Sequence, residues 1–185
     1  ASGKDSQLWM AMTMLDSSRA KSVLAKKTNV NVDQVSNMII WGNHSPTMYP
    51  DIENAVVNGE SISSVTNDMG WVENEFLPTV QQRGKAVIDA RGASSATSAA
   101  KAALDTVIAC ENPTDNNDSF SAAVESDGSY GVPEGLICGF PLSTDGNGVV
   151  TIKKGLDLSD FAKQKFQVSI DELISERQAV EHLMK

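Results

Sequence analysis

The chain has 185 residues and a formal net charge of −9, from 15 basic and 24 acidic side chains. This length suits one ordinary domain, so we expect a single domain over residues 1–185. Its shares of charged residues, 21 %, and of hydrophobic residues, 41 %, are typical of globular proteins and exclude disordered and collagen-like chains. The surplus of negative charge argues against nucleic acid as a partner, because the longest basic runs are only two lysine pairs.

The sequence also argues against a membrane segment and a metal site. No apolar stretch approaches the roughly 20 residues that cross a bilayer, and the first residues lack the apolar core of a signal peptide. The two cysteines, Cys110 and Cys138, are too far apart for a metal-binding or redox motif and too few for a disulfide framework. We interpret them as buried thiols in a reducing compartment, and we predict a cytoplasmic protein.

The first predicted element is a long amphipathic helix over residues 5–28, because apolar side chains recur there at steps of three and four residues. Asp16 and Arg19 lie one turn apart on this helix. It carries more large apolar surface than one covering layer needs, so we predict that it contributes to a homodimer interface together with residues 79–91. The side chains behind this prediction are Trp9, Met10, Met12 and Met14.

A short strand and a hairpin follow the first helix. Residues 35–41 are predicted to form a buried strand that ends at Gly42. His44 therefore lies at a strand end, where binding residues are held on a rigid frame. Residues 51–57, followed by the dipeptide Asn58-Gly59, are typical of a strand and a hairpin turn.

The middle of the chain is predicted to be helical. Residues 71–91 show a helical pattern that Pro78 should split or kink near Leu77, because proline lacks a backbone donor. Residues 94–110 form a second helix, rich in alanine. Residues 111–119 are rich in asparagine, aspartate and proline and form a loop.

The last third of the chain is predicted to contain a strand meander and a terminal helix. The strands lie at residues 120–125, 135–142 and 148–152, and the helix begins at Ser159. The order of helix, strands, helices, meander and helix predicts an α+β domain, with antiparallel strands packed against long helices.

His44 is the candidate for acid–base chemistry near neutral pH. The other histidine, His182, lies near the end of a helix, where the dipole favours a cation, and we interpret it as structural. If the first helix packs beside the His44 turn, Asp16 would orient the imidazole and Arg19 would bind a carboxylate with two parallel hydrogen bonds. The alternatives are an ion pair confined to the helix and a histidine that only caps its loop.

Five ordered motifs carry a family resemblance that extends over nearly the whole chain. They are residues 14–20 (MLDSSRA), 39–45 (IIWGNHS), 79–84 (TVQQRG), 94–101 (SSATSAAK) and 129–133 (SYGVP). In this order and at these distances they resemble the carboxy-terminal half of the cytosolic-type malate dehydrogenases, within the lactate/malate dehydrogenase family.

The resemblance implies a substrate domain for hydride transfer between NAD and malate or oxaloacetate. It implies that His44 is the proton donor and acceptor, that Asp16 hydrogen-bonds to it and that Arg19 pairs with a substrate carboxylate. Ser94 or Ser95 matches a residue of the substrate pocket. NAD would be bound by a different domain, with His44 as its only contact in this chain.

A dinucleotide-binding motif is missing from the sequence. The only G-x-G, at Gly146-Asn147-Gly148, has Thr151 in the third glycine position and is typical of a hairpin turn. We therefore expect no nicotinamide turnover by the chain alone. Two alternatives to a malate dehydrogenase function remain. One is a lactate dehydrogenase built on the malate dehydrogenase fold, and the other is a non-catalytic dimerisation module.

Overall fold

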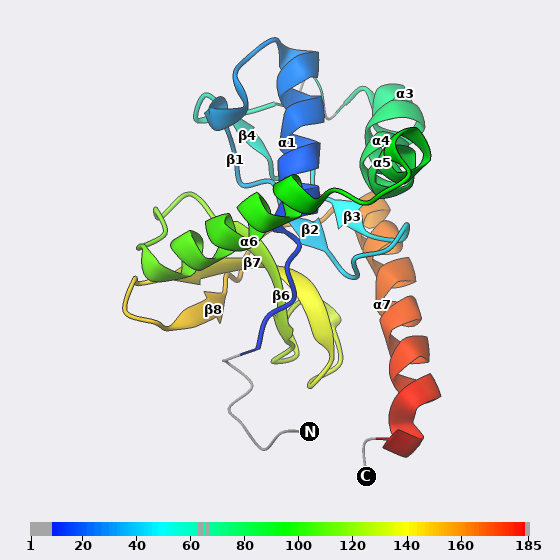
Figure 1. The fold of residues 1–185 in the computed structure, drawn as a ribbon. Coiled ribbons are helices and arrows are strands. Elements are labelled where there is room, and N and C mark those ends of the chain that lie inside the picture. Colours follow the sequence, from blue (N-terminus) through cyan, green and yellow to red (C-terminus); the bar gives the residue numbers. More distant parts are fainter. Residues whose placement is uncertain (1–8, 63–64, 66, 184–185) are drawn as a thin grey trace.

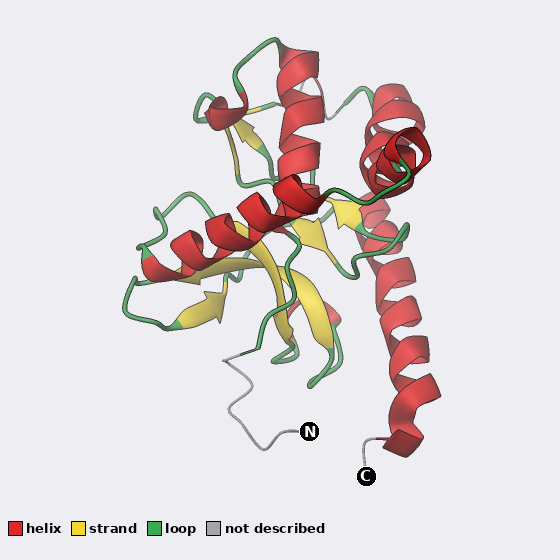
Figure 2. Cartoon of the chain, in the orientation of Figure 1, coloured by secondary structure: helices red, strands yellow, loops and turns green. Residues whose placement is uncertain are grey.

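A computed structural model describes residues 9–62, 65 and 67–183, and its helices and sheets are arranged as an α+β fold (Figures 1 and 2). The longer helices are α1 (Met14–Thr28), α5 (Arg83–Arg91), α6 (Ala96–Glu111) and α7 (Asp160–Val180). Two short helices, α3 (Met69–Trp71) and α4 (Leu77–Gln81), precede α5. Helix α6 lies across the largest sheet, and α1 packs against α4 and α6.

All the paired strands are antiparallel and form three small sheets, as the α+β prediction requires. The largest has the order β6 (Phe120–Glu125), β7 (Ile137–Thr144), β8 (Val150–Ile152). The second has the order β1 (Val35–Ser36), β4 (Val56–Val57), β5 (Glu60–Ser61), and the third pairs β2 (Ile40–Trp41) with β3 (Tyr49–Pro50). A bridge between Gly42 and Gly139 joins the end of β2 to β7.

The hydrophobic core lies behind the turn that follows β2. Trp41 is fully buried, and its ring meets Tyr130 and Phe140 edge-on and Phe166 at a tilt. Phe166 belongs to α7 and Phe140 to β7, so both elements pack against the base of this turn. Such aromatic packing gives β2 a rigid support.

The predicted start of the first helix is wrong. Helix α1 begins at Met14, because Ala11 pairs with Ala123 of β6 through two backbone hydrogen bonds of 2.9 and 2.8 Å. The backbone at Ala11 is therefore paired with the sheet, and Trp9, Met10 and Met12 lie outside the helix. Residues 5–8 lie outside the described part of the chain.

The predicted strand over residues 35–41 is interrupted at Asn37. This residue has a φ of 52° and separates β1 from β2, which belong to different sheets. The backbone N–H of Asn37 donates to Asp118, and its side chain donates to the Asn54 carbonyl and accepts from Ser119. These distant partners hold the left-handed conformation that asparagine tolerates.

The predicted strand over residues 51–57 is shorter than expected, whereas the hairpin after it is confirmed. Residues 51–54 form a turn in which Asp51 accepts two backbone N–H groups. The Asn58-Gly59 dipeptide joins β4 to β5 with φ angles of 53° and 80°. Both positive values suit a two-residue hairpin turn.

The predicted disturbance of the helix near Leu77 is a π turn and not a break. The chain widens into a π turn over Val72–Phe76, in which the Leu77 N–H reaches the Val72 carbonyl. This turn accommodates Pro78, which has no N–H and would clash with the carbonyl four residues earlier. The helical path breaks instead at Gln82, between α4 and α5.

The predictions for the last third of the chain are confirmed. Strand β6 has the expected bounds, and β7 and β8 lie within two residues of them. Ser159 caps α7 by accepting the Ala162 N–H. None of the helices among the described residues has the length and hydropathy of a bilayer-spanning helix.

Candidate active site

Asp16 is a fully buried carboxylate on α1 with a partner for each oxygen. Its Oδ1 accepts a 2.9 Å hydrogen bond from Arg19 Nη1, three residues along the helix. Its Oδ2 lies 2.5 Å from His44 Nδ1. A buried charge needs such partners to offset its lost hydration. The ion pair within the helix and the contact with the turn therefore coexist, and Asp16 connects them.

His44 lies in the loop of residues 42–48, which joins β2 to β3. Its side chain is 59 % exposed, and only its Nδ1 edge faces Asp16. A carboxylate accepts the Nδ1 proton, so the neutral ring carries its lone pair on Nε2. The hydrogen bond to Asp16 raises the pKa of His44 above 6.5, although partial burial and the Arg19 charge oppose this shift. The Nε2 atom can therefore bind and release a proton near neutral pH.

A second buried carboxylate, Asp51, braces the strands behind this loop. Its Oδ2 accepts 2.9 Å hydrogen bonds from Trp41 Nε1 and from the Asn54 side chain. Burial raises the pKa of Asp51, although these hydrogen bonds favour the charged form. Trp41 ends β2 and Asp51 follows β3, so their contact holds the two ends of the loop together.

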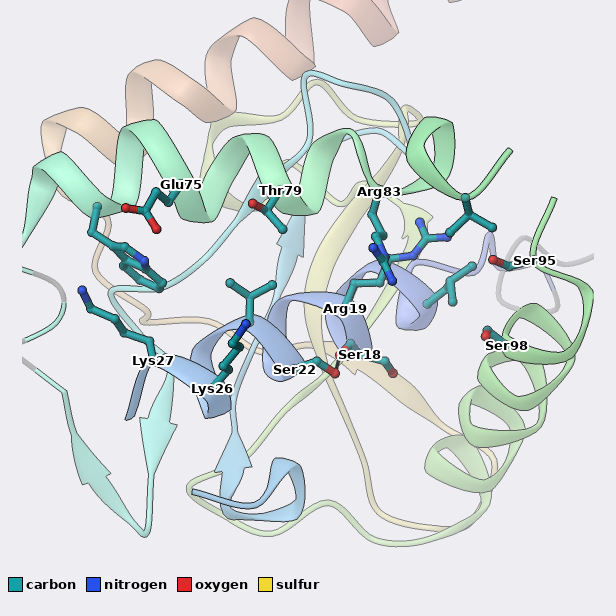
Figure 3. A pocket seen from close by; sticks show the side chains of 14 residues that line it. Ser18, Arg19, Ser22, Lys26, Lys27, Glu75, Thr79, Arg83, Ser95 and Ser98 are labelled. Atoms are coloured by element: carbon teal, nitrogen blue, oxygen red, sulfur yellow. Dashed lines mark hydrogen bonds between the residues drawn. The ribbon is translucent and has the colours of Figure 1, made fainter. Parts of the chain in front are cut away.

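A cavity of about 860 Å³ lies between α1, the segment α3–α5 and the start of α6 (Figure 3). Its lining residues are Leu15, Ser18, Arg19, Ser22, Val23, Lys26, Lys27, Trp71, Glu75, Thr79, Arg83, Val87, Ser95 and Ser98. Four of them are cationic and one is anionic, although the chain as a whole carries a charge of −9. The lining is thus more positive than the chain as a whole, which favours anionic ligands, although Arg19 is paired with Asp16 and Lys27 with Asp68.

The structure brings three of the five predicted site residues into one connected group. Asp16 touches both Arg19 and His44, and the Arg19 side chain lines the cavity at 15 % exposure. Ser95 is half-buried and lines the same cavity, whereas Ser94 is exposed and lies outside its lining. The geometry therefore favours Ser95 as the serine of the pocket.

Arg83 is a pocket residue to which the sequence analysis gave no role. It belongs to the TVQQRG motif and, like Arg19, lines the cavity in Figure 3. The cavity thus has one guanidinium group from α1 and one from α5. Their placement adds to the preference of this cavity for a carboxylate.

Metal binding has no geometric support in the described part of the chain. No group of three or more histidine, cysteine, aspartate or glutamate side chains there could hold a metal ion. Cys138 is buried and Cys110 is half-buried, and both are free thiols. Burial raises the pKa of the Cys138 thiol to about 12, so it is protonated at neutral pH.

Comparison with known proteins identifies the family. Residues 13–184 match the model of the lactate/malate dehydrogenase α/β C-terminal domain, and the chain belongs to this family. It is 51 % identical to a malate dehydrogenase of Cutibacterium acnes over 173 aligned residues. The alignment covers 94 % of this chain and 52 % of that protein. The chain thus spans about half the length of the curated relatives it matches.

Solved structures of the family share this fold. The malate dehydrogenase of Naegleria fowleri superposes with a TM-score of 0.90 at 39 % identity, covering 97 % of this chain and 54 % of that one. The lactate dehydrogenase of Trichomonas vaginalis in complex with NADH and oxamate gives a TM-score of 0.89 at 27 % identity, covering 97 % and 56 %. The resemblance predicted from the five motifs is confirmed.

Proposed function

We propose that this chain is the substrate domain of an NAD-dependent malate dehydrogenase, which reversibly oxidises (S)-malate to oxaloacetate. The observation that carries the proposal is the connected group of Asp16, Arg19 and His44. It combines a proton carrier with an anion-binding group, the two functions that oxidation of a hydroxy acid requires. The similarity to malate dehydrogenases at 51 % and 39 % identity supports the choice of substrate.

NAD, as the hydride acceptor, would be bound by a domain outside this chain. The sheets among the described residues are antiparallel, whereas dinucleotides bind on parallel strands that lead into a helix. The G-x-G at residues 146–148 lies in the turn between β7 and β8, and a Cβ at Gly146 would come within 2.7 Å of Pro113. Pro113 thus packs against the open side of Gly146, which is consistent with a hairpin turn.

The residues of this chain would handle the proton and the carboxylate. Arg19 donates one hydrogen bond to Asp16, and its other N–H groups have no hydrogen-bond partner among the described residues, so they could bind a substrate carboxylate. His44 Nε2 takes the hydroxyl proton of malate, and the Asp16 carboxylate stabilises the imidazolium that forms. In reverse, this imidazolium protonates the oxygen of oxaloacetate as it is reduced. Because the pKa of His44 is raised, the imidazolium form persists to higher pH. Malate oxidation needs the neutral imidazole as its base, so it is favoured at pH values above the pKa of His44.

Lactate dehydrogenase activity is the second candidate. The structural similarity to the Trichomonas vaginalis lactate dehydrogenase keeps this candidate open. The four cations in the cavity lining favour a substrate with two carboxylates, malate, over one with a single carboxylate. A non-catalytic interaction module is the third candidate, and the presence of the proton carrier beside the anion-binding group speaks against it.

Fusion to a cofactor domain tests the proposed function. We expect the 185-residue chain alone to show no turnover and no saturable NADH binding. Fused to the amino-terminal half of the Naegleria fowleri malate dehydrogenase, it should oxidise NADH with oxaloacetate faster than with pyruvate. Saturable NADH binding by the chain alone, or a folded, NADH-binding fusion that reduces neither substrate, would contradict the proposal.

We also propose a homodimer. Exposed apolar side chains support it: Ile88 of α5 is 48 % exposed, and Leu104, Val107 and Ile108 of α6 are 59, 58 and 49 % exposed. The part of the prediction that placed Trp9, Met10 and Met12 on the first helix is wrong. The cytoplasmic location stays a prediction, and we propose a role in the tricarboxylic acid cycle.

Sedimentation of the fusion protein tests the homodimer. We expect a dimer at micromolar concentration and a monomer for Val107→Asp, because a charge on this apolar face opposes its burial. Val149→Asp, at an equally exposed apolar position between β7 and β8, is the control and should remain dimeric. A monomeric parent, or a Val107→Asp dimer as tight as the parent, would refute this assembly.

A further inference from the structure

The loop that carries His44 is fastened to the C-terminal helix by side chains from one face of α7. Ser169, Glu172 and Glu176 are spaced by three and four residues, so they lie above one another on that face. The Asn43 backbone N–H donates to Ser169 Oγ at 2.7 Å, and the Asn43 side chain donates to Glu176 at 3.1 Å. The first residue before His44 is therefore held at two points.

Glu172 accepts hydrogen bonds from two hydroxyl groups that follow His44 in the loop. Ser45 Oγ donates to Glu172 Oε2 at 2.5 Å, and the Thr47 hydroxyl donates to the same oxygen. Burial of Glu172 disfavours its charge, but hydrogen bonds from Ser45, Thr47 and Asn43 outweigh this and lower its pKa. Glu172 is therefore ionised at neutral pH, and charge-assisted hydrogen bonds of this kind are the stronger ones.

The start of the loop, at Gly42, also packs closely against Ser169 of α7. Gly42 has a φ of 87°, and a Cβ at this position would lie 2.1 Å from Ser169 Oγ. The loop backbone thus approaches α7 as closely as a glycine permits. Helix α7 cannot move toward the loop, and the hydrogen bonds to Ser169 and Glu172 oppose movement away from it.

His44 itself is held from the opposite side. Its only hydrogen bonds among the described residues join its backbone N–H to the Asn43 side chain and its Nδ1 to Asp16. The charged groups that face this loop are Asp16 and Arg19 from α1, and Glu172 and Glu176 from α7. The position of the imidazole over Asp16 is therefore set by a loop whose other contacts lie on α7.

We propose that Glu172 is a positioning residue: by binding the Ser45 and Thr47 hydroxyls, it holds the loop so that His44 Nδ1 meets Asp16. The contacts of Glu172 with the loop lie within this chain and do not depend on the proposed function. Only the consequence for catalysis by His44 rests on that proposal. Glu172 acts through the loop and has no contact with the imidazole. Releasing the loop should weaken the bond between His44 and Asp16, and the pKa of His44 should fall with it.

The test is an NMR titration of the two histidines in the 185-residue chain. His182 is exposed at the end of the chain and serves as the internal reference, and a His182→Gln variant assigns the signals. In the parent, we expect His44 to titrate above 6.5. In Glu172→Gln, it should titrate closer to 6.5, whereas His182 should not change.

A second variant separates loop positioning from a direct effect of charge. Ser45→Ala/Thr47→Val removes both hydroxyls and leaves the Glu172 carboxylate, so it should lower the pKa of His44 as Glu172→Gln does. Asp171→Asn is the matched control on α7, since Asp171 is exposed and bonds only to Gln167 among the described residues. It should leave the titration of His44 unchanged.

Two results would overturn the inference. An unchanged His44 pKa in both loop variants, with lowered thermal stability, would mean that Glu172 only stabilises the packing of α7. A lowered pKa in Glu172→Gln alone would mean that its charge acts through space. The titration needs no turnover, so an inactive fusion protein with a Glu172-dependent pKa would refute the proposed function and leave this inference intact.

Discussion

His44→Asn should lower the turnover of oxaloacetate by the fusion protein about a hundredfold or more, the usual contribution of a positioned acid–base group. Asparagine can still hydrogen-bond to Asp16, but it cannot exchange a proton at the position of Nε2. The binding of NADH should change little, because the residues that would hold the dinucleotide lie outside this chain. Steady-state kinetics with oxaloacetate and a fluorescence titration with NADH measure the two effects.

His182→Asn is the matched control for this substitution. His182 is exposed on the last turn of the chain, far from the loop of residues 42–48, so turnover should stay at the parental level. A His44→Asn protein with full activity would end the assignment of His44 as the proton carrier. Loss of NADH binding together with turnover would point instead to a folding defect.

The central group of the site was predictable because its signals are local. Asp16 and Arg19 are three residues apart on a helix, and Gly42 marks the strand end that places His44 in a turn. Only the contact between helix and turn needed an assumption about packing, and the structure places Asp16 Oδ2 2.5 Å from His44. The resemblance carried by five motifs supplied the roles that spacing alone left open.

The supports of the loop were not predictable, because their partners are distant in sequence. Glu172 is 127 residues from Ser45, and no local pattern distinguishes it from other acidic residues on a solvated helix face. The same reason explains the misplaced strand over residues 35–41. Asn37 owes its left-handed conformation to Asn54, Asp118 and Ser119, which are 17 to 82 residues away.

Elements whose boundaries depend on local chemistry were predicted well. Ser159 was predicted to begin the last helix, and it caps α7 with its own hydroxyl. The predicted start of the first helix was wrong because residues 9–13 have a helical pattern, but Ala11 pairs with Ala123 at the edge of β6. Tertiary pairing with a sheet outweighs helix propensity there, since propensities amount to less than about 1 kcal/mol per residue.

Gly42→Ala should destabilise the chain by about 2–5 kcal/mol, the second large effect that the structure predicts. Two causes add. A side chain at a φ of 87° is strained by roughly 1–2 kcal/mol. In addition, the new Cβ would lie 2.1 Å from Ser169 Oγ and 2.5 Å from Ser169 Cβ, so α7 or the loop must move. Denaturant unfolding of the 185-residue chain measures the sum.

Gly59→Ala isolates the first cause. Gly59 has a similar φ of 80°, but nothing lies within 4 Å of the position that its Cβ would take. It should therefore cost only the backbone strain, and the excess cost of Gly42→Ala measures the contact with α7. Ser169→Gly, which removes both clashing atoms, should cancel much of that excess in the double variant despite its own cost within the helix. Equal costs for Gly42→Ala and Gly59→Ala would show that α7 does not press on the loop that carries His44.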